Sequence, residues 1–289
     1  MKFVDYIHLF RVSHWIKSGF VLAPAFFSGR FISAWESVVL AGLAFAIVAS
    51  SVYIINDIRD VDYDKNNSEK VNVFAIGKMS IETGWMLAAV LLIGGLAIQA
   101  INNWILGYWL LAYFAMNVIY SMGVKQIPYL EMLFVMAGFI IRIMYGADVA
   151  GVPNTGWLYI EVVLFTGLIV SGKRLKEIRS FQASGKQARK VLSHYRRRIF
   201  EIIFGVMSLA LAGVYIAYCL NTEVQLRVGN EVLYTVPIVL FGVGRYVYRV
   251  VKLDGSMNPV RMLYRDIWIA LSVLSWVVVW LYVLYGKAL

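Results

Sequence analysis

Four aspartates lie within eight residues of one another, in the stretch NDIRDVDYD at residues 56–64. In a continuous helix, Asn56, Asp60 and Asp64 share one face with Asp57 beside them, because side chains four residues apart are neighbours. Carboxylates packed this closely repel one another unless a cation lies between them. Oxygen ligands suit Mg²⁺, which shares its coordination sphere with water and substrate phosphates. The stretch therefore predicts a magnesium site with Asp57, Asp60 and Asp64 as ligands.

The alternative is a solvated helix end whose acidic residues have no role. That reading is weak, because the chain has only 17 acidic residues among 289.

A second polar stretch, SGKRLKE at residues 171–177, carries cations where the first carries acids. Lysine binds phosphate oxygens as a point charge and arginine binds them as a fork. We expect Lys173 and Arg174 to contact phosphate directly, with Glu177 orienting a cation or a ribose hydroxyl. The alternative is that both cations anchor the chain at a membrane surface.

The elements that must position these residues are membrane helices. The chain is 61% hydrophobic with a mean hydropathy of +0.71, well above the apolar content of soluble domains. We expect an all-α polytopic membrane protein, folded as one integral-membrane catalytic domain over residues 1–289. Runs of about 20 apolar residues predict nine transmembrane helices, at approximately 16–33, 37–55, 80–101, 104–120, 127–150, 156–171, 199–220, 231–250 and 267–286.

The basic residues predict the orientation. With the amino terminus inside, 23 of the 27 Lys and Arg residues fall on the cytoplasmic side. The net charge of +10 therefore reflects membrane orientation and anionic ligands, and no nucleic-acid partner is expected. We expect an integral protein of a bacterial inner membrane whose amino terminus and active-site face are cytoplasmic. The single cysteine, Cys219, excludes an intramolecular disulfide and any multi-cysteine metal site.

Arg142 is the one basic residue that lies deep within an expected span, more than five residues from either end. A charge at that depth is expected to face the protein interior rather than lipid. We expect Glu161, at similar depth in the next span, to be its ion-pair partner.

The acidic stretch resembles the first aspartate motif, N-D-x-x-D-x-x-x-D, of the UbiA superfamily of intramembrane prenyltransferases. Arg11, Trp15 and Lys17 match the opening motif R-P-x-Q-W-x-K-N of the same family. The resemblance implies nine helices around a cavity that opens laterally, with the aspartates holding Mg²⁺ on a diphosphate donor. It also implies that Arg11, Lys17 and Asn56 bind substrate.

The G-K-R-x-x-E pattern resembles one branch of that family, the decaprenyl-phosphate 5-phosphoribosyltransferases. Gly138, Arg142 and Gly146 also match that branch, as does a tyrosine at Tyr195, which is expected to contact substrate. The implied reaction moves 5-phosphoribose from phosphoribosyl diphosphate to a polyprenyl phosphate and releases diphosphate. Asp57, Asp60, Lys173 and Arg174 are the implied catalytic residues.

Two features depart from this pattern. The branch has an Arg-Pro-Ile-Ala-x-Gly stretch after the aspartates, where this chain reads VNVFAIGK at 71–78, so a substrate-binding arginine is missing. The second aspartate motif of ordinary prenyltransferases is replaced by the cations of 171–177.

Two other functions stay open. One is a conventional prenyltransferase that moves a prenyl group to an aromatic or glycerol-phosphate acceptor. The other is a transporter, because intramembrane charges also mark transport paths. A transporter is disfavoured because the carboxylates cluster at one face of the membrane.

Overall fold

The computed structural model describes residues 3–65, 72–153, 155–184, 190–252, 262 and 265–286. Within these ranges every regular element is a helix. The chain forms two compact units, Met1–Asn154 and Thr155–Leu289, called here the first and the second unit. The expected all-helical class is confirmed, and the expectation of one catalytic domain stays a prediction.

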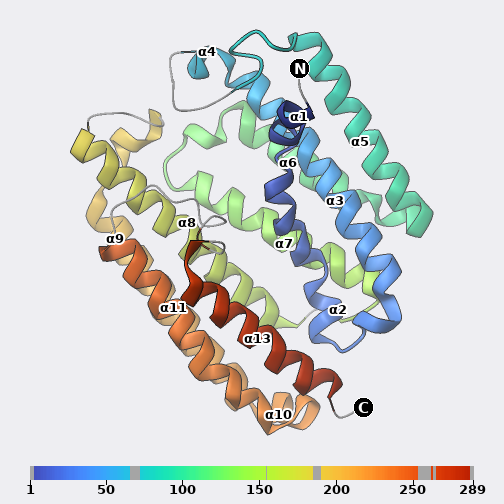
Figure 1. Cartoon of the computed structure of the whole chain (residues 1–289), viewed down its shortest axis with the longest axis vertical. Coiled ribbons are helices and arrows are strands. Elements are labelled where there is room, and N and C mark those ends of the chain that lie inside the picture. The colour runs from blue at the N-terminus through green and yellow to red at the C-terminus, as the bar shows by residue number, and fades with distance from the viewer. Residues whose placement is uncertain are drawn as a thin grey trace. The chain divides into compact units, whose positions relative to one another are not determined.

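The first unit is built around one long buried helix, α3 (Phe31–Arg59), coloured blue in Figure 1. Alanine and valine dominate its middle and make it narrow enough for close packing against α5, α6 and α7. Gly95 of α5 shows how close this packing is, because a Cβ placed there would lie 2.9 Å from the Ala44 carbonyl oxygen. The helices and 3-10 turns of this unit, besides α3, are α1 (Phe3–Leu9), η1 (Val12–Val21), α2 (Ala23–Phe27), α4 (Val61–Asp64), α5 (Ile81–Asn103), η2 (Trp104–Leu106), α6 (Gly107–Met122), η3 (Val124–Gln126) and α7 (Leu130–Ala150).

The first expected span, 16–33, is not a single helix. The chain there forms the 3-10 helix η1 and the short helix α2, with Pro24 in the first turn of α2. Proline has no backbone N–H and fixes φ, so it begins a new helix more readily than it continues an old one. Gly29, at φ +75°, then turns the chain into α3.

The second unit contains four long helices and their connections. The long helices are α8 (Gly156–Ser184), α9 (Arg197–Leu220), α11 (Thr235–Lys252) and α13 (Ile267–Tyr285), joined by the shorter η4 (Lys190–His194), α10 (Thr222–Val228) and η5 (Asn230–Tyr234). α8 packs along α9, and α11 packs along α13. The Tyr215 hydroxyl ties three of these elements together, because it donates to Thr235 and accepts from the Trp276 indole at 2.8 Å.

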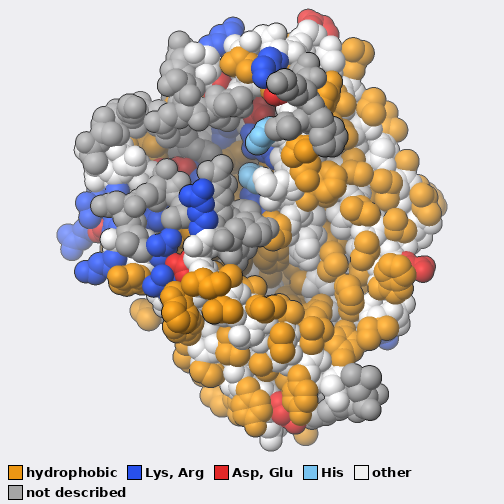
Figure 2. Space-filling model, in the orientation of Figure 1, with side chains coloured by type: hydrophobic (Ala, Val, Ile, Leu, Met, Phe, Trp, Pro, Cys, Tyr) orange, Lys and Arg blue, Asp and Glu red, His pale blue; other side chains and the backbone are white. Residues whose placement is uncertain are grey.

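Five helical stretches of the described residues are long and apolar enough to cross a membrane, or six if the bent pair from Thr222 to Lys252 forms one span. One of the five, Ile81–Met122, has 42 residues, about twice the length needed for one crossing. Side chains on the long helices are mostly hydrophobic on the visible face, as Figure 2 shows. The protein is therefore an integral membrane protein, and the count of nine spanning helices is not confirmed.

Candidate functional site

The acidic stretch lies at the carboxyl end of α3, where the helix bends. α3 ends at Arg59, Asp60 has a non-helical conformation, and α4 resumes at Val61. Backbone hydrogen bonds from Asp60 to Asn56 and from Asp64 to Asp60 keep the helical rise across this bend. The backbone spacing that places Asn56, Asp60 and Asp64 on one face is therefore preserved across the bend.

Asp57 is paired with Arg11 of the amino-terminal segment. The Arg11 Nη2 atom lies 2.5 Å from Asp57 Oδ1, and the guanidinium stacks over the Tyr53 ring. Arg11 has a left-handed backbone conformation, with φ 49° and ψ 47°, between α1 and η1. Such a conformation is costly for a residue with a Cβ, and strained residues of this kind gather at functional sites.

Asp60 is paired with Lys125, a residue outside the sequence motifs described above. The Lys125 ammonium donates to Asp60 Oδ1 and, at 3.2 Å, to Asn56 Oδ1. Asn56 in turn donates to Asp60 Oδ2, and Ser121 donates to Asn56. This pairing joins η3 to the end of α3. The only signal for it in the sequence is a single basic residue in a short loop between two apolar segments.

Asp64 is held by Asn72, which is 1% exposed. The Asn72 amide donates to Asp64 Oδ2 and to the Asp57 carbonyl oxygen, both at 2.8 Å. Its oxygen accepts from the backbone N–H of Phe74 at 3.0 Å. Asn72 falls within the 71–78 stretch that departs from the expected arginine motif, although Val71 itself lies outside the described residues. The asparagine fastens this loop to the acidic helix end.

The acidic end is a partial fit to Mg²⁺. Hard carboxylate and amide oxygens are present, but no group of three acidic or histidine side chains close enough to hold a metal occurs among the described residues. Magnesium is usually held by one or two carboxylates together with water and substrate phosphates. Asp57 and Asp60 fit that mode best, because Asp57 lines a pocket and Asp60 is only partly buried, whereas the Asp64 carboxylate is buried and accepts from Asn72. The ligand set of Asp57, Asp60 and Asp64 stays a prediction.

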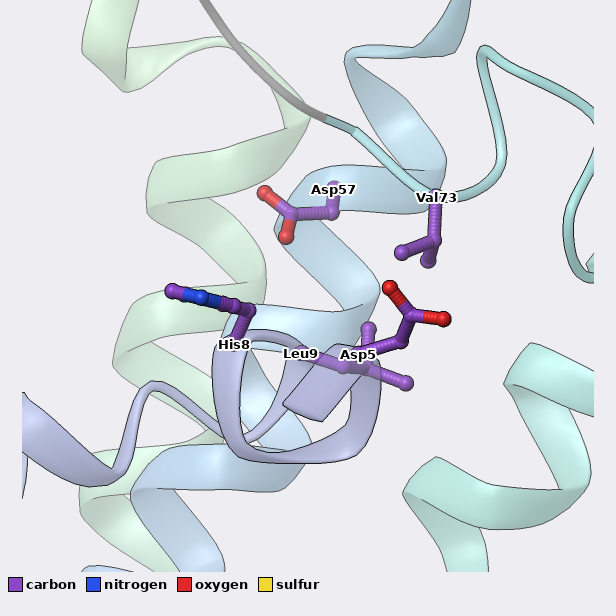
Figure 3. Close-up of a pocket in the computed structure, with 5 residues that line it drawn as sticks. All are labelled: Asp5, His8, Leu9, Asp57 and Val73. Atoms are coloured by element: carbon purple, nitrogen blue, oxygen red, sulfur yellow. The ribbon is translucent and has the colours of Figure 1, made fainter. Parts of the chain in front are cut away.

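A small open pocket lies beside Asp57. Its lining residues are Asp5, His8, Leu9, Asp57 and Val73, and Figure 3 shows Asp57 and His8 pointing into the same space. Lys78 forms an ion pair with Asp5 at 3.2 Å, which joins α1 to the loop that carries Val73. The helix α1 therefore forms one wall of the pocket that exposes the Asp57 carboxylate.

Arg142 is buried, as expected, with 4% of its surface exposed. Its Nη1 donates to the Gly138 carbonyl oxygen at 2.7 Å, its Nη2 donates to the Tyr113 hydroxyl at 3.0 Å, and three aromatic rings surround it. All of these partners belong to the first unit. Glu161 belongs to the second unit, and its pairing with Arg142 stays a prediction.

In the second unit, Glu177 brings the two cations of α8 together. The Arg174 guanidinium forms an ion pair with Glu177, and the Lys173 ammonium lies 3.8 Å from the same carboxylate. Arg174 is 3% exposed, whereas the Lys173 side chain is 43% exposed. Gly172, just before them, leaves room for the Tyr246 hydroxyl, which would lie 2.7 Å from a Cβ at that position. A glycine is thus required for helix packing here.

Tyr195 is buried against Phe200, with ring centroids 4.6 Å apart. This contact is hydrophobic packing, and the expected contact with substrate stays a prediction.

A further charged cluster fixes the ends of α11 and α13. Asp266 accepts hydrogen bonds from Arg245, lies 3.0 Å from Arg249 Nε, and caps α13 through the Trp268 and Ile269 N–H groups. Burial alone would raise the pKa of the Asp266 carboxyl, but the Arg245 and Ile269 hydrogen bonds and the two nearby guanidinium charges lower that pKa below its usual value. The cluster is structural, since its acid is fully engaged by its own unit.

Known proteins resemble this chain over most of its length. The model of the UbiA prenyltransferase family matches residues 18–267. A decaprenyl-phosphate phosphoribosyltransferase of Mycolicibacterium smegmatis is 25% identical over 281 residues, which cover 92% of this chain and 88% of the relative. A protein of the same name from Corynebacterium glutamicum is 28% identical over 224 residues, or 74% of this chain and 66% of the relative.

One solved structure shares the fold. It is a UbiA homologue from Archaeoglobus fulgidus bound to DMAPP and Mg²⁺, which is 17% identical, covers 95% of this chain and 98% of its own, and has a TM-score of 0.67. At that identity the likeness concerns the fold alone.

Proposed function

Since this chain belongs to the UbiA prenyltransferase family, we propose that it transfers 5-phosphoribose from phosphoribosyl diphosphate to a polyprenyl phosphate and releases diphosphate. The class of protein, a membrane-embedded transferase, follows from the family. The identity of the donor, phosphoribosyl diphosphate, is the more specific part of the proposal.

The observation that carries the choice of donor is the pair Lys173 and Arg174. The two cations lie beside the carboxylate of Glu177, and residues 173–177 carry three basic side chains and one acidic side chain. Direct phosphate contact suits such a group, whereas a second magnesium site requires carboxylates. Phosphoribosyl diphosphate carries a 5-phosphate in addition to its diphosphate, and a prenyl diphosphate does not. The name of the Mycolicibacterium smegmatis relative, which matches 92% of this chain, supports the same donor.

The reaction needs little proton transfer. The acceptor phosphate is already ionised near neutral pH, so one of its oxygens attacks the anomeric carbon without a general base while the bond to diphosphate breaks. Arg11 and Lys125 lie against Asp57 and Asp60, and both present donors suited to phosphate oxygens. We expect them, with Lys17 and Asn56, to hold the donor's diphosphate.

Mg²⁺ held by Asp57 and Asp60 would neutralise charge that develops on the leaving diphosphate. The chain's own part is to present these two carboxylates at the end of α3, where Asp57 lines a pocket. Arg174 and Lys173 would hold further phosphate oxygens, with Glu177 limiting their motion.

We also propose that the acidic end of α3 faces the cytoplasm, where a water-soluble donor is available. The distribution of basic residues supports this orientation. A cysteine introduced at Ser193 should react with an impermeant reagent from the cytoplasmic side, and one at Asn221 only from the other side. The native Cys219 is buried, so it should give little background.

The experiment that tests the function uses purified full-length protein with Mg²⁺, a polyprenyl phosphate and labelled phosphoribosyl diphosphate. Label in a lipid-soluble product is the expected result. A parallel reaction contains prenyl diphosphate and aromatic or glycerol-phosphate acceptors. Product in the parallel reaction alone would overturn the phosphoribosyl proposal in favour of conventional prenyl transfer.

A further inference from the structure

The end of the first unit that lies opposite the acidic end of α3 carries polar residues of its own. The helix α7 runs away from the acidic end, because η3, which directly precedes α7, contacts that end. The chain just after α7 lies beside the start of α3, where Arg30 Nη1 donates to the Gly151 carbonyl oxygen at 3.4 Å. The connection from α5 to α6 reaches the same end, since the Asn102 amide donates to the Ser37 carbonyl oxygen at 2.9 Å. The last turn of α7 and the first turn of α6 therefore lie together there.

These two turns contribute a carboxylate and two aromatic side chains. Asp148 lies in the last turn of α7, and Tyr108 and Trp109 lie in the first turn of α6. The Tyr108 hydroxyl and the Trp109 indole both donate to Asp148 Oδ2, at 2.9 and 2.8 Å. The two ring centroids are 5.0 Å apart. Two donors on one oxygen fix the orientation of the carboxylate, and its second oxygen, Oδ1, accepts no hydrogen bond from the described residues.

Asp148 is an exposed acid without a cation. It forms no ion pair with any residue that the structure describes, and the last turn of α7 contains no basic side chain. The carboxyl end of a helix carries partial negative charge, so a carboxylate in the last turn is unfavourable unless a cation lies close to it. Asp148 Oδ1 is therefore a suitable position for a cation from outside the chain.

The side chains around Asp148 are those of a membrane boundary. Trp104, Ile105 and Tyr108 are all exposed, at the point where the apolar stretch from Ile81 to Met122 breaks. Exposed tryptophan and tyrosine near the ends of membrane helices are typical of the headgroup layer. The cation that this layer offers is the ammonium group of a zwitterionic lipid.

We propose that Asp148, Tyr108 and Trp109 form a binding site for the ammonium headgroup of phosphatidylethanolamine. A primary ammonium donates a charge-assisted hydrogen bond to Asp148 Oδ1, and the adjacent aromatic rings attract the same cation. The quaternary ammonium of phosphatidylcholine keeps the charge but has no N–H donor. The anionic headgroup of phosphatidylglycerol is repelled by the carboxylate. The site thus favours one class of headgroup.

The test measures lipid binding to the delipidated full-length protein in detergent by native mass spectrometry. The probes are phosphatidylethanolamine, phosphatidylcholine and phosphatidylglycerol with the same acyl chains, so that only the headgroup differs. We expect phosphatidylethanolamine to bind about 10-fold more tightly than phosphatidylglycerol, the scale of one charge-assisted hydrogen bond. It should bind about 3-fold more tightly than phosphatidylcholine, which keeps only the attraction between the cation and the rings.

Asp148→Asn should abolish this preference, because the substitution removes the charge and keeps an oxygen that can accept from Trp109. Tyr108→Leu, at an exposed position, should reduce the preference about 3-fold through loss of the ring. Glu223→Gln is the matched control, because Glu223 is an exposed acid in the first turn of α10 that no side chain in the described part of the chain contacts by a hydrogen bond.

Equal binding of phosphatidylethanolamine and phosphatidylglycerol, or a preference that persists in Asp148→Asn, would overturn the headgroup site. Equal binding of phosphatidylethanolamine and phosphatidylcholine would overturn its assignment to a primary ammonium. These outcomes are independent of the proposed function, because the measurement contains no phosphoribosyl donor, acceptor or Mg²⁺.

Discussion

The two charged regions of the molecule are built in opposite ways. At the end of α3, two cations and an amide contact three aspartates, and the stretch 56–64 carries four acids and one base. On α8, two cations lie beside one glutamate, and residues 173–177 carry three bases and one acid. The difference indicates that the first region is suited to a metal cation and the second to phosphate.

The largest effect should come from removing a carboxylate of the first region. Asp57→Asn or Asp60→Asn should lower turnover roughly 10²–10³-fold, because charge on the leaving group would lose its metal. Steady-state rates at limiting Mg²⁺ check this. Asp62→Asn is the control, since the Asp62 side chain is 97% exposed and contacts Lys65. Near-normal rates in the Asp57 and Asp60 variants would contradict a magnesium site at the end of α3.

The next effect concerns the second region. Lys173→Ala and Arg174→Ala should each weaken binding of phosphoribosyl diphosphate by roughly 1.5–3 kcal/mol, the scale of a charged hydrogen bond. Isothermal titration measures this directly. Arg197→Ala serves as control, because Arg197 is a half-exposed cation paired with Glu201. Unchanged donor affinity in both variants would indicate that Lys173 and Arg174 anchor the chain at the membrane surface. That result would favour prenyl transfer.

A structural effect of similar or smaller size should follow from Asn72→Ala. The substitution removes the buried amide that donates to the Asp57 carbonyl and to the Asp64 carboxylate, which should cost about 1–3 kcal/mol of unfolding free energy. Thermal unfolding in detergent is the measurement. Asn117→Ala is a milder comparison, since Asn117 bonds only one carbonyl of its own helix. Equal melting temperatures for the two variants would contradict the role of Asn72.

The smallest effect should be a gain in metal affinity. Lys125→Met removes the ammonium that competes for Asp60, so Mg²⁺ should bind about 3- to 10-fold more tightly without donor. The Mg²⁺ concentration at half-maximal thermal shift reports this change. Lys125→Arg keeps the charge and should leave the affinity near normal. A weaker affinity in Lys125→Met would mean that the lysine supports the metal.

The sequence predicted the features that depend on local spacing. The helical face of Asn56, Asp60 and Asp64, the interior position of Arg142 and the family itself came from residues close together in the chain. The partners of the acids did not, because Lys125 lies 65 residues from Asp60, and apolar periodicity carries no information about that pairing.

The break of the first span and the conformation of Arg11 were also missed. Pro24 marked the break, but the strong apolar run around it favoured a continuous helix. Nothing in the residue types near Arg11 indicates a left-handed backbone, a conformation usually taken by glycine. Tertiary pairing with Asp57 decides it instead.

That left-handed arginine has a consequence for protein engineering. A stability-guided redesign would replace Arg11 by glycine, which removes a conformational cost of about 1–2 kcal/mol. The redesigned protein would lack the guanidinium that meets the buried Asp57, and the loss of that ion pair opposes the conformational gain. Residue 11 should therefore be held fixed in any library, because backbone strain alone is a misleading guide at a position whose side chain pairs with Asp57.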